Sequence, residues 1–286
     1  MKTWLITGGT SGFGQAYAEA ALEQGDQVVL TARNVERLET WARDREKTVL
    51  VLPLDVTDPA QVASAVDAAQ NRFGAIDVLV NNAGGGSHGA VEDTGEAVIR
   101  STFEVNFFGT VAMIRAVLPR MRARRSGCIV NISSVGGVRA FPGVGYYNAA
   151  KFAVEGISES LRQEVEPLGI KVLVVEPGAF RTKADSAGYS AGTTRVLDDY
   201  AHTVGALSEA LVAMNGKQPG DPRRAARAVV QAVASDDPPH HLVLGSLGFD
   251  QVTAKLETML AQIRAWEDVA RGADFPDSTH KPGAYV

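Results

Sequence analysis

The apolar residues of the chain gather in seven short runs, which are separated by longer stretches of mixed polarity. Within each run Val, Ile and Leu are nearly continuous instead of alternating with polar residues. This is typical of strands that are buried on both faces, as in a parallel sheet covered by helices. The runs are TWLIT (3–7), QVVLTA (27–32), TVLVLPLDV (48–56), IDVLVNNAG (76–84), GCIVNISS (127–134), IKVLVVEPG (170–178) and HLVLGS (241–246).

The stretches between these runs carry apolar residues at helical spacing. The clearest are 15–24, 59–73, 102–121 and DPRRAARAVVQAV at 221–233. Strands that alternate with helices through right-handed crossovers form a doubly wound sheet. We therefore predict an α/β fold, with one Rossmann-type parallel sheet of about seven strands flanked by helices.

No linker, repeat or low-complexity tract divides the chain. We therefore expect one domain over residues 1–271, followed by a polar, frayed tail over 272–286. Residues 183–220 interrupt the regular alternation, and their middle, YAHTVGALSEALVAM, has helical spacing. Because an insertion beyond the carboxyl ends of the strands lies where a substrate lid would sit, we predict a helical lid over this segment.

Composition narrows the possible functions. The net charge is -5, and the basic run RMRARR at 120–125 ends a predicted helix, where cations suit the helix dipole, so nucleic-acid binding is not expected. No apolar run approaches the roughly 20 residues of a membrane span. The first strand begins almost at once, leaving no room for a signal peptide, and the single Cys128 excludes an internal disulfide. We expect a cytoplasmic protein.

A glycine-rich turn follows the first predicted strand. It reads Thr7-Gly8-Gly9-Thr10-Ser11-Gly12-Phe13-Gly14. Glycines allow a tight turn and let backbone N–H groups approach a phosphate at a helix N-terminus, where the helix dipole favours an anion. A plain strand-to-helix turn also favours glycine, but the position between the first strand and a helix favours dinucleotide binding.

The end of the second predicted strand bears on the choice of dinucleotide. An acidic residue there accepts hydrogen bonds from the adenosine ribose, whereas a cation pairs with a 2′-phosphate. Ala32 stands where the acid would be, and Arg33 follows it. This favours NADP(H) over NAD(H), with Arg33 as the phosphate partner. Arg33 could instead cap a surface loop, and Arg37, one helical turn on, could share either role.

Motifs in order along the chain resemble those of the classical short-chain dehydrogenase/reductase family, over roughly residues 3–182 and again at the last strand. Besides the TGxxxGxG turn, these are Asp55-Val56 after the third strand, the NNAG sequence at 81–84, and the PGxxxT sequence at 177–182. Asn106, Ser134, Tyr147 and Lys151 match the family's catalytic tetrad. The resemblance implies an NAD(P)-dependent oxidoreductase with a Rossmann-type fold.

The resemblance also implies which residues contact the cofactor. The Asp55 carboxylate would accept a hydrogen bond from the adenine amine, and PGxxxT would grip the nicotinamide carboxamide. The implied cofactor residues are Gly8, Thr10, Ser11, Gly12, Phe13, Gly14, Arg33, Asp55, Val56, Asn82, Ala83, Gly84, Tyr147, Lys151, Pro177, Gly178, Phe180 and Thr182.

Two adjacent tyrosines precede the lysine of the tetrad. Tyr147 and Lys151 are four residues apart and so share one helix face, whereas Tyr146 would have Ala150 in the partner position. Family spacing between serine and tyrosine likewise selects Ser134 over Ser133. We therefore expect Tyr146 to serve packing and Ser133 to be structural.

The tetrad residues suit hydride transfer to or from a carbonyl carbon. Tyr147 can donate the proton that the developing alkoxide needs, although a free phenol has a pKa of about 10. A neighbouring ammonium such as Lys151 stabilises the phenolate and lowers that pKa. Ser134 can orient the substrate oxygen, and in the resembling family Asn106 holds a water that links the lysine to solvent. The implied reaction is reduction of a ketone or aldehyde, or oxidation of the alcohol.

The substrate pocket is expected between the loop after the fourth strand and the loop from Ser134 to Tyr147. This places His88, Val138, Arg139, Phe141 and Pro142 near the rim. AFPGVGYY, the apolar lid and a similarity to hydroxysteroid and retinol dehydrogenase-like members favour a hydrophobic substrate. We interpret His88 as an exposed loop histidine, His240 and His241 as a turn entering the last strand, and find no metal-site spacing among the five histidines.

Two other functions use part of this pattern. A catalytically silent NADP(H)-binding sensor or scaffold would need the glycine turn but not Tyr147, Lys151 and Ser134 together. A dehydratase or epimerase of the extended relatives also uses Tyr-xxx-Lys, but its glycine spacing is missing. The family resemblance further implies a homodimer or homotetramer built on the helices near 102–121 and 145–167.

Overall fold

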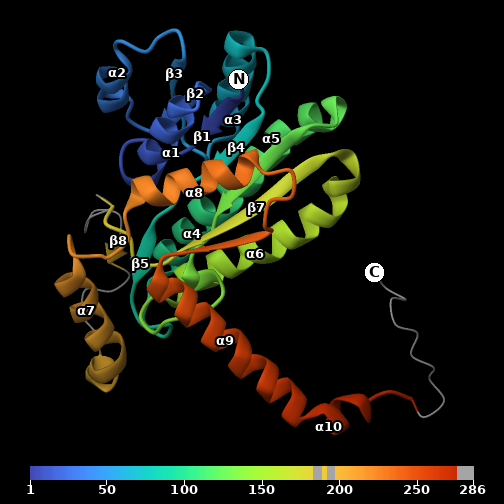
Figure 1. Cartoon of the computed structure of the whole chain (residues 1–286). Coiled ribbons are helices and arrows are strands. Elements are labelled where there is room, and N and C mark those ends of the chain that lie inside the picture. Colours follow the sequence, from blue (N-terminus) through green and yellow to red (C-terminus); the bar gives the residue numbers. More distant parts are fainter. Residues whose placement is uncertain (183–188, 192–196, 276–286) are drawn as a thin grey trace.

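A computed structural model describes residues 1–182, 189–191 and 197–275. A seven-stranded parallel sheet with the order β3-β2-β1-β4-β6-β7-β9 forms the centre of the described chain (Figure 1). The strands are β1 (Thr3–Ile6), β2 (Gln27–Ala32), β3 (Val49–Pro53), β4 (Val78–Asn81), β6 (Gly127–Ile132), β7 (Ile170–Pro177) and β9 (His241–Leu244). Each predicted run therefore contains a strand, and the predicted doubly wound Rossmann-type sheet is confirmed.

Both faces of the sheet are buried, which explains the nearly continuous apolar runs. In β1, Trp4 and Ile6 point into one core, and Leu5 points into the other. The first core lies under α1 (Gly12–Glu23), α2 (Glu36–Ala42) and α8 (Pro222–Ala234), and the second under α3 (Pro59–Phe73), α5 (Gly109–Arg124) and α6 (Gly145–Val165). Alternate residues of a strand point to opposite faces, so a sheet covered on both sides needs apolar residues at every position.

Capping residues set the ends of several helices. The Asp58 carboxylate accepts hydrogen bonds from the N–H groups of Ala60 and Gln61, and Pro59 occupies the first turn of α3. Asp221 accepts from the N–H of Arg223 in the same way at the start of α8. Aspartate caps followed by proline satisfy otherwise unpaired donors and preset the backbone angle, so both helices begin where the sequence predicts.

The helical stretch predicted at 102–121 contains a π-helical turn. α4 (Glu96–Phe103) continues into this turn (Glu104–Phe108) and then into α5. Asn106 lies within the turn, and its side-chain amide donates to the carbonyl of Thr102. π-turns inside helices are often found at functional sites, because they redirect a side chain without ending the helix.

The described part of the predicted lid lies against the rim loops. β5 (Gly86–His88) pairs in parallel with β8 (Tyr189–Ala191), and a π-helical turn (Ala201–Gly205) leads into α7 (Ala206–Met214). Tyr200 donates a hydrogen bond to Glu92, and Val204 packs beside Gly143. Residues 183–188 and 192–196 of the predicted lid lie outside the described residues.

The sequence analysis did not predict the long helix after β9. α9 (Ser246–Ala265) and α10 (Glu267–Arg271) project away from the body of the molecule (Figure 1). Residues 276–286 of the predicted tail lie outside the described part. Short 3-10 turns complete the fold at Val135–Gly137, Glu166–Leu168 and Asp198–Tyr200. Within the described ranges, no helix combines the length and apolar character needed to cross a membrane.

Candidate active site

The glycine turn is packed too tightly for side chains. Gly12 has a φ of +61°, and a Cβ there would lie 3.0 Å from the Cβ of Thr182. A Cβ on Gly14 would lie 2.3 Å from the carbonyl oxygen of Gly8. The turn therefore requires glycine at both positions, and it brings the start of α1 next to the end of the PGxxxT segment.

Polar side chains join the ends of β1 and β4 at the point where the strand order reverses. The Thr7 hydroxyl accepts hydrogen bonds from the N–H groups of Asn82 (3.0 Å) and Ala83 (2.9 Å). The Asn82 side-chain amide donates to the carbonyls of Thr7 (2.9 Å) and Gly8 (3.0 Å). Open α/β sheets bind their ligands in the crevice at such a reversal, so these bonds hold the walls of a candidate nucleotide crevice.

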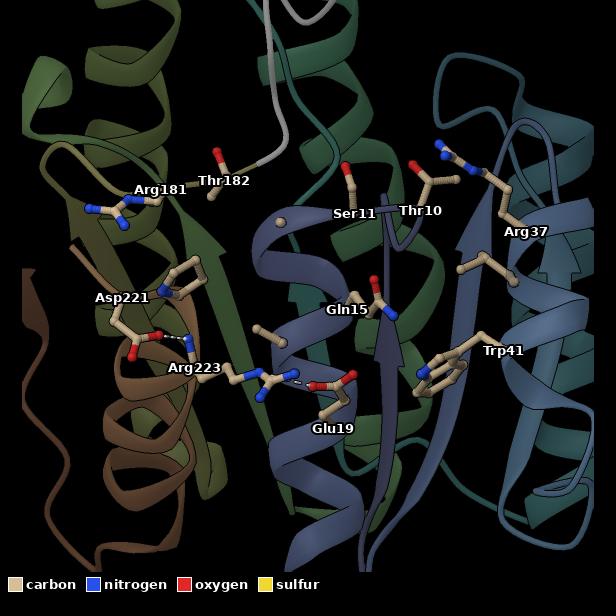
Figure 2. Close-up of a pocket in the computed structure, with 14 residues that line it drawn as sticks. Thr10, Ser11, Gln15, Glu19, Arg37, Trp41, Arg181, Thr182, Asp221 and Arg223 are labelled. Atoms are coloured by element: carbon tan, nitrogen blue, oxygen red, sulfur yellow. Dashed lines mark hydrogen bonds and ion pairs between the residues drawn. The ribbon is translucent and has the colours of Figure 1, made fainter. Parts of the chain in front are cut away.

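A cleft of about 650 Å³ begins at the glycine turn and runs along the outer side of α1, between α2 and the start of α8. Figure 2 shows Thr10 and Ser11 at its edge, Arg37 and Trp41 on one side, and Arg181, Thr182 and Arg223 on the other. Arg37 thus lines the cleft itself. Backbone N–H groups at a helix N-terminus together with Arg37 suit a phosphorylated ligand. Of the other two arginines, Arg223 pairs with Glu19 and Arg181 donates to the Gln218 carbonyl.

Arg33 lies near the predicted adenine-side carboxylate. The pKa of Asp55 is lowered, chiefly by hydrogen bonds from the backbone and hydroxyl of Thr57 and to a smaller extent by the charge of Arg33. One oxygen of Asp55 accepts from both Thr57 groups, at 3.0 and 2.7 Å. The Asp55 carboxylate is therefore ionised and held in one orientation. Both properties suit a group that accepts a hydrogen bond from an amine of the ligand.

Three other predicted cofactor residues pack their side chains within the protein. The Phe13 ring lies 5.1 Å from the Phe180 ring and stacks on Tyr17 at 5.7 Å. Val56 is buried against Gly109, where a Cβ would lie 2.5 Å from it. In the PGxxxT segment, the N–H of Gly178 donates to the carbonyl of Leu244. These residues therefore shape the backbone around the cleft.

Ser134 and Tyr147 converge above Gly136. A Cβ on Gly136 would lie 3.3 Å from the Ser134 hydroxyl and 3.5 Å from a ring carbon of Tyr147. Ser134 follows β6, and its hydroxyl accepts a hydrogen bond from the N–H of Gly136 at 3.0 Å. The end of β6 and the start of α6 thus bring the Ser134 hydroxyl and the Tyr147 ring to one place.

Lys151 and Asn106 converge beside Gly84. A Cβ on Gly84 would lie 2.8 Å from the Asn106 side-chain oxygen and 3.5 Å from the Lys151 Nζ. The Lys151 Nζ also donates to the Ile132 carbonyl at 2.8 Å, and it lies 5.8 Å from the centre of the Tyr147 ring. The four residues of the predicted tetrad therefore lie close together, around Gly84 and Gly136.

Burial weakens the proton affinity of Lys151. Burial lowers the pKa of Lys151 to about 8, against a smaller raising effect of the Glu155 charge. An amine with a pKa near neutral can exchange protons easily, which suits a group that supplies protons to a neighbouring phenol.

Some of the residues predicted at the rim of the substrate pocket lie in other surroundings than expected. His88 lies half-buried in β5 and not in an exposed loop, because β8 pairs with this segment, and burial lowers its pKa. The two predicted rim loops do meet, since the N–H of Gly89 donates to the carbonyl of Gly143 at 2.9 Å. Arg139 stacks over Phe141 and lines a second hollow against α9.

Val138 precedes this arginine, and Pro142 lies exposed at the surface of the same loop. Tyr146 is half-buried, and its hydroxyl donates to the Val91 carbonyl. Ser133 is buried beside Glu155.

The sequence analysis missed two sets of buried polar residues. Asn81 donates to Asn131, and Asn131 donates to Ser158, each at 2.8 Å, joining β4, β6 and α6. Glu155 and Glu176 lie together on the α6 side of β7. Asn131 and Glu176 interrupt apolar strands, and that was the available signal, because a buried polar group needs a partner.

Comparison with known proteins agrees with this geometry. The chain matches the family profile described as short chain dehydrogenase over residues 2–190. It is 37% identical over 262 residues to 3-ketodihydrosphingosine reductase of Bacteroides thetaiotaomicron, covering 92% of this chain and 91% of that protein. The structure of a short-chain dehydrogenase from Streptomyces avermitilis matches with a TM-score of 0.89 and 43% identity, covering 96% of this chain and 99% of the other.

A structure of ElxO with NADP bound matches at 28% identity and a TM-score of 0.70, covering 85% of this chain and 96% of that one. The glycine cradle and the helix N-terminus described above fit such a dinucleotide. Profile, full-length relative and structural neighbours therefore agree: the chain belongs to the short-chain dehydrogenase/reductase family and is an NAD(P)-dependent oxidoreductase.

Proposed function

We propose that this oxidoreductase uses NADP(H) to reduce a ketone or aldehyde, or to oxidise the corresponding alcohol, with Tyr147 as the general acid or base. The observation that carries this proposal is the convergence of Ser134 and Tyr147 at Gly136, and of Lys151 and Asn106 at Gly84. A binding protein without turnover has no need for this arrangement.

In the reduction, each residue of the proposed site would have its own role. When bound, the nicotinamide supplies the hydride that the carbonyl carbon accepts. The Ser134 hydroxyl would donate to the carbonyl oxygen and orient it. Tyr147 would give its phenolic proton to that oxygen as the new C–H bond forms, so that the product is an alcohol and the residue is left as phenolate.

Lys151 would then return a proton to Tyr147. Its pKa of about 8 lets it give up a proton at moderate pH, and its position beside Asn106 places it near the π-helical turn. Asn106 would hold the water through which Lys151 regains its proton. In the oxidative direction the same groups would act in reverse, with Tyr147 as the base.

The cofactor preference rests on the arginines. Arg33 follows β2, with Ala32 where an acidic residue would repel a 2′-phosphate, and Arg37 lines the cleft. An arginine that pairs with the 2′-phosphate favours NADPH over NADH, because charge-assisted hydrogen bonds to phosphate are about twice as strong as neutral ones.

We further propose a hydrophobic substrate. The described lid contributes the buried Val204 to the rim loop at Gly143, and one relative is a reductase named for a keto substrate, 3-ketodihydrosphingosine. Residues 1–271 would act as one domain, and its lid at 183–220 would close over this substrate. The active form of the enzyme would be a homodimer or homotetramer.

The test compares Tyr147→Phe with its neighbour Tyr146→Phe. Loss of the acid should lower turnover by about 10²- to 10⁴-fold, while NADPH binding stays close to that of the unaltered protein. Tyr146→Phe removes only the hydrogen bond to the Val91 carbonyl and should retain turnover. NADPH oxidation is followed by absorbance against a panel of apolar ketones and aldehydes. Normal turnover in Tyr147→Phe would show that the phenol is not the acid.

A further inference from the structure

Three side chains from separate elements meet between α6 and the edge of the sheet. They are Glu155 of α6, Glu176 of β7 and His241 of β9, and one ligand atom of each lies within 4.8 Å of the others. Nδ1 of His241 is 2.7 Å from an oxygen of Glu176 and 3.6 Å from an oxygen of Glu155. This cluster contains none of the tetrad residues, but it adjoins them, because Glu155 lies one helical turn after Lys151.

The carboxylates of this cluster are buried without sufficient partners. Glu176 is 1% exposed and Glu155 is 8% exposed. One oxygen of Glu176 and both oxygens of Glu155 have no hydrogen-bond partner among the described residues. Burial raises the pKa of Glu155, against a smaller lowering effect of the Ser133 hydroxyl. Native proteins rarely leave such oxygens unpaired, because desolvation of a carboxylate is costly.

The charges around the cluster are predominantly negative. Glu155 and Glu159 face it from α6, Glu176 faces it from β7, and His241 faces it from β9, with His240 beside His241. Two buried carboxylates whose oxygens lie within 4.8 Å of each other need a positive charge or a shared proton beside them. Glu176 raises the pKa of His241, so a protonated imidazole offsets part of this negative charge, and a bound cation would offset more of it. Lys151 directs its ammonium to the Ile132 carbonyl and is engaged in the tetrad.

We propose that Glu155, Glu176 and His241 form a binding site for a divalent transition-metal cation, with Zn²⁺ bound more tightly than Mn²⁺. One imidazole nitrogen and two carboxylate oxygens are a ligand set that Zn²⁺ accepts, and the order of metal affinities places Zn²⁺ above Mn²⁺. Ligand atoms about 2.0–2.1 Å from a tetrahedral Zn²⁺ lie about 3.4 Å apart. The observed separations of 2.7 and 3.6 Å lie on either side of that value.

The surroundings of His241 fit a metal-bound imidazole. Its Nδ1 faces the two buried carboxylates, while its Nε2 faces an oxygen of Glu159 at 3.8 Å. A carboxylate on the far ring nitrogen is the usual support for a metal-binding histidine. The His241 side chain is 43% exposed, which gives a cation access from solvent and leaves room for a water as the fourth ligand. The three ligands come from three elements, so no spacing in the sequence revealed them.

The experiment is a calorimetric titration of the chelator-treated full chain with ZnCl₂ and then with MnCl₂ at pH 7.5. We expect one Zn²⁺ per chain, weaker Mn²⁺ binding, and a higher thermal unfolding midpoint with Zn²⁺, because a bound cation would tie α6 to β7 and β9. Absence of Zn²⁺ binding would overturn the proposal, as would Mn²⁺ binding tighter than Zn²⁺.

Variants locate the site. His241→Ala and Glu176→Gln should each weaken Zn²⁺ binding by at least about tenfold, since even supporting residues outside the ligand set contribute that much. Glu164→Gln removes an exposed carboxylate from the same helix and should bind as the unaltered chain does. Because Glu176 is buried, Glu176→Gln can disturb the fold, and circular dichroism checks whether that variant is folded. His241 is half-exposed, so His241→Ala is the variant that decides the test. Undiminished Zn²⁺ binding in His241→Ala would place any bound ion elsewhere and overturn the proposal.

Discussion

Arg33 and Arg37 stand in different places relative to the nucleotide cleft. Arg37 lines the cleft together with Thr10 and Ser11 (Figure 2), whereas Arg33 is exposed and acts electrostatically on Asp55. A 2′-phosphate carries charge that an unmodified ribose lacks, so an arginine that binds it contributes to NADPH affinity and not to NADH affinity.

We predict that Arg33→Ala weakens NADPH binding by about 10- to 100-fold, which corresponds to one lost hydrogen bond between charged groups, and leaves NADH binding nearly unchanged. Fluorescence titration with each nucleotide measures this. Arg37→Ala is the matched comparison on the next helical turn. An equal loss for NADPH and NADH would count against Arg33, and a selective loss confined to Arg37→Ala would assign the phosphate to Arg37.

Single residues were predictable where local spacing decides their position. The four-residue separation of Tyr147 and Lys151 selects this tyrosine over Tyr146, because it depends only on the geometry of one helix. His88 was placed wrongly, since its burial comes from pairing with β8, a segment far away in the sequence. The approach of Glu155, Glu176 and His241 likewise depends on tertiary packing and was not visible in the sequence.

Among the helices, α6 buries the amine of Lys151 in its second turn. The pKa of Lys151 is lowered by burial from 10.5 to about 8. At pH 7 the lysine is protonated in both the folded and the unfolded protein, so the folded state bears the full cost of burying the charge. Between pH 8 and 10.5 the folded protein releases this proton before the unfolded chain does, and the free energy of unfolding therefore rises with pH.

We predict that Lys151→Met makes the protein more stable by about 2 kcal/mol at pH 7. The lowered pKa corresponds to about 3 kcal/mol, and the lost hydrogen bond to the Ile132 carbonyl offsets about 1 kcal/mol. The advantage should disappear by about pH 10 as the unaltered lysine deprotonates. Urea unfolding at pH 7 and pH 9.5 measures the change, with the exposed Lys47→Met as control. A pH-independent difference would contradict a buried charge at position 151.

Helices in which the spacing of apolar residues is irregular were less predictable than the strands. The π-helical turn at Glu104–Phe108 adds a residue to one turn, which periodicity over 102–121 does not resolve. α9 was missed because only Gly248 and Val252 of its 20 residues are buried. Burial in the core therefore does not impose a regular spacing of apolar residues on this helix. The helices with aspartate caps were located accurately because their signals are local.

At the scale of the whole molecule, the sheet was predictable because burial on both faces imposes apolar residues at every strand position. Right-handed crossovers then restrict the strand order to very few possibilities. The oligomeric state was not predictable in the same way, because contacts between copies of the chain depend on surface residues and not on the core. Among the exposed apolar side chains, two separate groups lie on helices where a second copy could pack.

One part includes Phe152 and Ile157 of α6 with Phe108 at the π-helical turn, and the other is the projecting α9 with Leu256, Leu260 and Ile263 (Figure 1). The resemblance to the family favours the first. We therefore predict a dimer or tetramer for the unaltered chain and a smaller species for Phe152→Glu, because burying a charge in an apolar interface is costly.

Ile263→Glu provides the matched comparison, since Ile263 is 57% exposed and Phe152 is 45% exposed. Sedimentation velocity measures the mass of each variant, and circular dichroism verifies that each is folded. An interface on α6 requires that Ile263→Glu keeps the mass of the unaltered chain while Phe152→Glu does not. The reverse result would move the interface to α9, and a monomeric unaltered chain would contradict the predicted assembly altogether.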